Sequence, residues 1–141
     1  ECGASGAGID VQGFRPRELE IYKKTKGVTE KIADFSCDER LVAVAERVET
    51  TKHTMRGVIG SADEWNNQID RIALLRERYQ TVAEEMESAA MAQLCVSYGV
   101  PFIGVRIISN SIVNGEEYDE SVGMDIQKFV IAYVEELNGF S

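Results

Sequence analysis

Residues 84–109 hold the sequence feature that most constrains the fold, because a helical segment leads directly into a nearly continuous apolar segment. Small and apolar residues recur at helical spacing through Glu84–Tyr98, and Gly99 followed by Pro101 stops the helix. The sequence FIGVRIIS over Phe102–Ser109 predicts a strand in a parallel sheet that is covered on both faces. This succession is typical of an α/β fold.

Other segments continue the alternation of helices and short strands. Ser36 and Glu39 have the spacing of a capping box, and the apolar residues after them predict a helix over residues 38–50. Helical spacing also predicts a helix from Asp70 and a last helix over Ser121–Leu137. Further expected elements are an extended piece at Val11–Phe14, a helical turn around Glu18–Tyr22, a buried strand at 54–61, a strand at Thr81–Ala83 and a loop at 110–120. The inner face of the last helix is expected to be Val122, Ile126, Phe129, Val130, Tyr133, Val134 and Leu137.

Length and charge set limits on the class of protein. The 141 residues are enough for one domain with a real core, so a single domain over 1–141 is expected. The net charge of −9 disfavours binding to nucleic acid or to an anionic membrane surface, since both need a cationic face. No uninterrupted apolar stretch approaches the ~18 residues of a membrane-spanning helix. The three cysteines include no CxxC pair, which argues against a zinc site or a disulfide scaffold and fits a reducing compartment.

The expected strand ends direct attention to Glu85-Met86-Glu87, because ligands of such sheets bind beyond the carboxyl ends of the strands. A carboxylate beside a helix N-terminus can accept two hydrogen bonds from the vicinal hydroxyls of a sugar. The alternative is a solvated acidic first turn that complements the helix dipole.

Two further residues carry candidate chemistry. Trp65, the only tryptophan, lies in a polar segment and offers a stacking face for a planar base, or else covers the edge of the core. Asn110, directly after Ser109, can donate and accept through one amide and so read the edge of a heterocycle, or else begins a turn. His53 has no partner for a triad or a metal site and is expected at the surface.

Several motifs in the same order resemble the purine nucleoside phosphorylase superfamily. They are the helix signature EMESAAMAQLC at 85–95, the segment VPF at 100–102 with RIISN at 106–110, the loop SADEW at 61–65 and the glycine turn GASG at 3–6. The resemblance runs over roughly residues 56–137 and is nearest to the branch of 5′-methylthioadenosine/S-adenosylhomocysteine nucleosidases. It implies a three-layer α/β/α fold with a mixed central sheet, which is incomplete in this chain.

On the sugar side, the resemblance implies that Glu87 holds the ribose hydroxyls and that Met86 packs against the sugar. Glu85 is expected among the substrate-binding residues of the same segment. Phe14 would reach the substituent on the sugar, which in this superfamily can belong to the ligand of a neighbouring subunit.

On the base side, the resemblance implies that Trp65 stacks on or flanks the purine and that the backbone near Asn66 reads its Watson–Crick edge. Asn110, with Ser109 before it, occupies the place of the catalytic residue on the N7 side. A hydrogen bond to N7 makes the base a better leaving group in an oxocarbenium-like transition state. No cofactor and no metal are implied.

The sequence departs from the superfamily pattern in three ways. Asn110 stands where the adenine-cleaving nucleosidases usually have Asp, and family members that handle 6-oxopurines can also carry Asn there. Members have a longer N-terminal part, which carries the first strands and the water-activating or phosphate-binding groups. The stretch between Gly8 and Ile9 is also shortened. We therefore expect the isolated 141 residues to be catalytically incompetent, with an unpaired sheet edge.

The expected function is a cytoplasmic, homo-oligomeric nucleosidase that hydrolyses the N-glycosidic bond of methylthioadenosine- or adenosylhomocysteine-like nucleosides. The alternatives are a phosphate-dependent phosphorylase, a futalosine-type hydrolase of 6-oxopurines, and a purine-binding relative without catalysis. The expected partner is a small purine nucleoside, with neither nucleic acid nor membrane.

Overall fold

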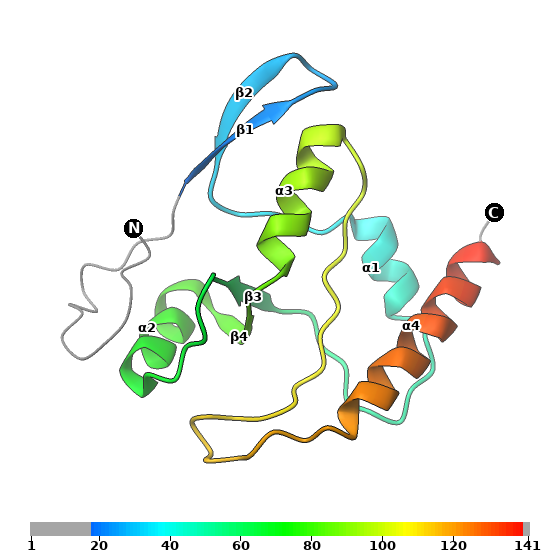
Figure 1. Cartoon of the computed structure of the whole chain (residues 1–141). Helices are drawn as coiled ribbons and strands as arrows, with labels where there is room; N and C mark the ends of the chain where they lie inside the picture. The colour runs from blue at the N-terminus through cyan, green and yellow to red at the C-terminus, as the bar shows by residue number, and fades with distance from the viewer. Residues whose placement is uncertain (1–17, 140–141) are drawn as a thin grey trace. The chain divides into compact units, whose positions relative to one another are not determined.

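The computed structural model describes residues 18–139, which form helices, one antiparallel strand pair and one parallel strand pair (Figure 1). The α/β class is therefore confirmed, and the sheets are not closed. The residues form two compact units, one up to Ser36 with Gly57–Pro101 and one of Cys37–Arg56 with the residues from Phe102 onward. The expected extended piece at Val11–Phe14, Phe14 itself and the glycine turn at residues 3–6 lie outside the described residues.

The first unit begins with a hairpin. Strand β1 (Leu19–Lys23) pairs antiparallel with β2 (Val28–Ile32), and Gly27 closes the turn with a φ of +68° that favours glycine. The helical turn expected around Glu18–Tyr22 is wrong. Strand pairing overrides the local pattern there, with Ile21 pointing inward and only 7% exposed.

Strand β3 (Val58–Ser61) lies parallel to β4 (Thr81–Glu85), and helix α2 (Ile69–Tyr79) connects them. The helix expected from Asp70 is confirmed. The strand expected at Thr81–Ala83 is confirmed and runs two residues further. The strand expected at 54–61 starts only at Val58, because β4 provides pairing partners only from there. Val58 is 48% exposed and the other three residues are only half-buried, so the expectation of a buried strand is wrong.

Helix α3 (Ser88–Tyr98) follows β4 after a two-residue bend (Figure 1). It ends at Gly99 with a φ of +68°, which confirms the predicted stop. Its start is four residues later than predicted, since Glu84 and Glu85 belong to the strand.

The hairpin is attached to the C-terminal end of α3. The Lys24 N–H donates to the Ser97 carbonyl at 2.8 Å, and the Ser97 hydroxyl donates to the Tyr22 carbonyl at 2.6 Å. The Lys24 ammonium lies 4.0 Å from the centre of the Tyr98 ring, a cation–π distance. These contacts join helix and hairpin within the first unit.

The second unit contains helix α1 (Glu39–Ala45) and helix α4 (Val122–Asn138). A small core forms where Val44, Val48 and Tyr133 pack together. The last helix is confirmed to within one residue at each end. Its expected inner face is only partly correct, because Val130, Val134 and Leu137 are exposed. The helix expected over 38–50 is shorter, and Asp38 rather than Ser36 caps it.

The strand expected at Phe102–Ser109 is wrong: this segment has no secondary structure and pairs with no other segment of residues 18–139. Two hydrogen bonds connect it to the segment before α1. The Asp38 N–H donates to the Phe102 carbonyl at 2.8 Å, and the Gly104 N–H donates to Cys37 Sγ at 3.4 Å. Apolar content favours a strand, but a ladder also needs a partner. The loop expected at 110–120 is confirmed. No helix over residues 18–139 combines the length and the apolar character needed to cross a membrane.

Candidate functional site

The carboxyl ends of β3 and β4 bring two predicted segments together in the first unit. Ser61 at the end of β3 lies opposite Glu85 at the end of β4. The Ala62 N–H donates to the Glu85 carbonyl at 3.1 Å, which extends the pairing by one step. The loop with Trp65 leaves from one strand and the Met86-Glu87 bend from the other, at the edge where ligands of parallel sheets bind.

The Glu85 side chain faces the first turn of α3. Its Oε2 accepts the Ser88 N–H at 2.8 Å and the Glu87 N–H at 3.1 Å, and its Oε1 also lies 3.1 Å from the Ser88 nitrogen. The first N–H groups of a helix have no partner within it, so these hydrogen bonds cap α3. The strand-end carboxylate thus stabilises the helix electrostatically as well.

Ser61 contributes to the same cap from the neighbouring strand. Its Oγ accepts the Ala89 N–H at 3.1 Å, across 28 residues of sequence. Three successive N–H groups, those of Glu87, Ser88 and Ala89, therefore donate to side chains at the two strand ends.

Glu87 stands at the N-cap position of α3, yet its side chain forms no capping hydrogen bond with the described backbone of the helix. Its Oε2 lies 3.4 Å from the Met86 nitrogen. Both Glu87 and Met86 are exposed, Met86 by 42%. An exposed carboxylate at the positive end of a helix dipole is suited to accept hydrogen bonds from hydroxyl groups.

The loop after β3 carries Trp65 and Asn66. Trp65 is 60% exposed, so its ring is accessible for stacking. The Asn66 amide donates to Glu84 Oε2 at 2.7 Å, and its Oδ1 accepts the Gln68 N–H at 3.2 Å. Sequence reasoning missed the role of Glu84, whose only local signal is its exposed position in a strand beside Glu85.

Ser109 and Asn110 are neighbours in the second unit, and both are half-buried. The Ser109 hydroxyl donates to Asn110 Oδ1 at 3.3 Å, and the Ser109 carbonyl accepts the Asp119 N–H at 2.8 Å. Because Oδ1 accepts from the serine, the amide nitrogen of Asn110 presents its donor side elsewhere. Such a group can donate a hydrogen bond and cannot transfer a full proton.

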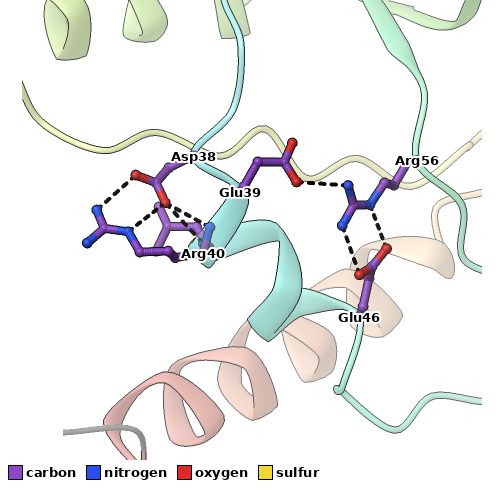
Figure 2. Close-up of polar contacts among 6 residues, drawn as sticks. Asp38, Glu39, Arg40, Glu46 and Arg56 are labelled. Carbon is purple, nitrogen blue, oxygen red and sulfur yellow. Dashed lines mark hydrogen bonds and ion pairs between the residues drawn. The ribbon is translucent and has the colours of Figure 1, made fainter.

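The charged side chains in and beside α1 form hydrogen bonds and ion pairs with one another (Figure 2). Asp38 caps the helix and pairs with Arg40 at 2.9 Å, and the hydrogen bond from Arg40 holds the pKa of Asp38 below its usual value. Arg56 contacts Glu46 at 2.6 Å and Glu39 at 2.9 Å, and its hydrogen bond lowers the pKa of Glu46. These pairs lie at the surface and stabilise local structure only modestly.

Over residues 18–139, no group of three or more His, Cys, Asp or Glu side chains has the arrangement of a metal site. His53 is exposed, as expected. The predicted site residues that the structure describes offer carboxylates, an aromatic ring, a thioether, a hydroxyl and amides.

Comparison with known proteins identifies the class. A profile of the phosphorylase superfamily matches residues 8–140, and the chain belongs to this superfamily. It is 32% identical over 112 residues to proteins named 5′-methylthioadenosine/S-adenosylhomocysteine nucleosidase from Bacillus cereus (strain G9842), Bacillus thuringiensis (strain Al Hakam) and Bacillus anthracis (strain A0248). Each match covers 73% of this chain and 48% of the relative, so the chain spans about half the length of these relatives.

Proposed function

We propose that the protein is a nucleosidase that hydrolyses the N-glycosidic bond of purine nucleosides of the methylthioadenosine or adenosylhomocysteine type. The observation that carries the proposal is the bend at Met86-Glu87, where an exposed carboxylate stands at the start of α3 without capping it. The names of the similar Bacillus proteins support the same reaction class.

Glu87 is the residue proposed to hold the two ribose hydroxyls. One carboxylate can accept both hydroxyl hydrogens, and hydrogen bonds to a charged acceptor are stronger than neutral ones. The negative charge also favours the positive charge that develops on the sugar ring as the bond to the base breaks. Met86 is proposed to pack against the sugar, and Phe14 to contact its 5′ substituent.

The purine is proposed to stack on Trp65, with the backbone of Asn66 reading its edge. Asn110 is proposed to donate a hydrogen bond from its amide nitrogen to N7, with Ser109 orienting that amide. This hydrogen bond would stabilise negative charge on the departing base. Because an amide transfers no proton, the leaving base must take its proton from water or from another group.

The amide at position 110 favours one alternative substrate class. The Asn110 amide nitrogen carries two donor hydrogens, so it suits 6-oxopurines, in which N7 and O6 are neighbouring acceptors. The alternative function is therefore hydrolysis or phosphorolysis of an inosine-like nucleoside.

The experiment is base release by the complete protein from methylthioadenosine, adenosylhomocysteine, adenosine, inosine and guanosine, each with and without phosphate. Adenine released without phosphate is the expected result. Release of hypoxanthine or guanine would show that the substrate is a 6-oxopurine nucleoside. Dependence on phosphate would show that the reaction is phosphorolysis and not hydrolysis. Binding of a nucleoside without release of any base would overturn the proposal in favour of a non-catalytic relative.

A further inference from the structure

We propose that Glu85 is a positioning residue, which together with Ser61 fixes the first turn of α3 so that the Glu87 carboxylate points toward the sugar. Glu85 is then not itself a ligand of the substrate. This inference rests on the proposed function of Glu87.

The first step is the direction of the Glu85 side chain. Both of its oxygens lie within 3.1 Å of the Ser88 nitrogen, and Oε2 also accepts the Glu87 N–H. Glu85 therefore caps the first turn of α3 with both of its carboxylate oxygens. Its half-buried position at the end of β4 agrees with this, whereas Glu87 is exposed.

The second step is what the cap does to Glu87. Its own N–H donates to Glu85 at 3.1 Å, so the backbone of residue 87 is fixed from the strand end. With Ser88 bound to Glu85 and Ala89 bound to Ser61, the N–H groups of the first two residues of α3 already have acceptors, and that of Ala89 is one that an N-cap side chain commonly accepts. The Glu87 side chain itself makes no capping hydrogen bond to α3.

The third step is the origin of the cap. Ser61 and Glu85 lie opposite each other in the parallel pair, so the register of β3 and β4 decides where the two acceptors stand. A shift of one strand by one residue would point its capping side chain to the other face of the sheet and separate the two acceptors. The position of Glu87 therefore depends on the strand pairing rather than on α3 alone.

The cap is tested by the amide proton shifts of the complete protein in the variants Glu85→Ala, Glu85→Gln and Ser61→Ala. We expect Glu85→Ala to shift the Glu87 and Ser88 signals upfield and Ser61→Ala to shift that of Ala89. Glu85→Gln keeps a carbonyl acceptor and is expected to restore part of the shift. Asp38→Ala is the matched control, because it removes the cap of α1 and leaves the α3 signals in place. Unchanged Glu87 and Ser88 signals in Glu85→Ala would overturn the proposal.

The positioning role is tested by a double-mutant cycle in kcat/KM with Glu87→Ala. Glu85→Ala alone is expected to lower kcat/KM on the order of tenfold, the size of coupling between residues in contact. In the Glu87→Ala background the same change is expected to cost less than about twofold. If Glu85→Ala still lowers kcat/KM about tenfold in that background, the proposal is overturned, since Glu85 would then act on the substrate directly.

Failure of the proposed function has a different signature. If the wild-type protein releases no base, nucleoside affinity replaces kcat/KM in the same cycle. A loss of affinity in Glu85→Ala that vanishes in the Glu87→Ala background then supports the positioning role without catalysis. Equal affinity of the wild type and Glu85→Ala, or an absence of nucleoside binding by both, would overturn it.

Discussion

Helices α1 and α3 begin in two different ways. In α1 the N-cap residue Asp38 accepts the N–H groups of Arg40 and Leu41 itself, at 2.9 and 3.4 Å. In α3 the N-cap residue Glu87 does not cap, and the acceptors are Glu85 and Ser61 from the ends of two strands.

The comparison separates a local cap from one built by tertiary structure. The cap of α1 involves four consecutive residues and stabilises only its own helix. The cap of α3 links the helix to the strand pair, and an exposed carboxylate remains at its N-cap position. A helix start that is capped from elsewhere can carry a functional group in the place where a capping side chain normally stands.

The largest expected effect comes from changing the N-cap residue of α3. If Glu87 holds the ribose hydroxyls as proposed, Glu87→Ala is expected to lower kcat/KM on the order of 100-fold, because two charge-assisted hydrogen bonds to the sugar would be lost. The free energy of unfolding should change little, since this side chain caps no helix. Steady-state kinetics and urea unfolding measure the two quantities. A variant that loses stability and keeps its activity would reverse the assignment of Glu87 and Glu85.

The second effect is the stability of the tertiary cap. Glu85→Ala is expected to lower the free energy of unfolding by about 1–2 kcal/mol and Ser61→Ala by about 1 kcal/mol, as for other lost caps. Urea unfolding at neutral pH checks both values. Because the two side chains cap the same turn, the loss of unfolding free energy in the double variant should differ from the sum of the two single losses. Strict additivity would indicate two independent caps.

The third effect is the pH dependence of the local cap. The hydrogen bond from Arg40 lowers the pKa of Asp38 in the folded chain, so its contribution to stability is present above the ordinary Asp pKa of about 3.9. That contribution is lost as the pH falls through the lowered pKa. The difference in Tm between the wild type and Asp38→Asn should therefore be larger at pH 7 than at pH 2. A difference that grows on acidification would contradict this cause.

The smallest effect is expected for the exposed ion pairs of Arg56 with Glu46 and Glu39 (Figure 2). Arg56→Ala should lower the Tm only slightly, because surface pairs are weak and screened. The difference from the wild type should vanish in 1 M NaCl, where the Debye length is about 3 Å. A difference that survives in high salt would show that the aliphatic part of Arg56 contributes by packing.

Local signals account for the parts of the fold that the sequence predicts well. Apolar periodicity and a glycine stop suffice for α2, α4 and the end of α3, because these features depend on residues within a few turns. The hairpin β1–β2 and the absence of a strand at Phe102–Ser109 could not be predicted in this way. Both depend on which segments find a pairing partner, which is a property of the whole chain.

The same distinction applies to the candidate site. The strand-end rule directs attention to Glu85-Met86-Glu87, and these residues do lie where β4 ends and α3 begins, since the start of a helix after a strand can be recognised locally. It does not distinguish the roles of the two glutamates. That difference arises from the register that sets Ser61 opposite Glu85, which no spacing within residues 84–95 reveals.

The most direct test of the account compares Glu87→Gln with the wild type on methylthioadenosine and on its 2′,3′-dideoxy analogue. If Glu87 holds the ribose hydroxyls, kcat/KM for the ribonucleoside falls on the order of tenfold or more, while that for the dideoxy analogue changes by less than about twofold. An equal loss on both substrates would contradict the account, because Glu87 would then act through something other than the sugar hydroxyls.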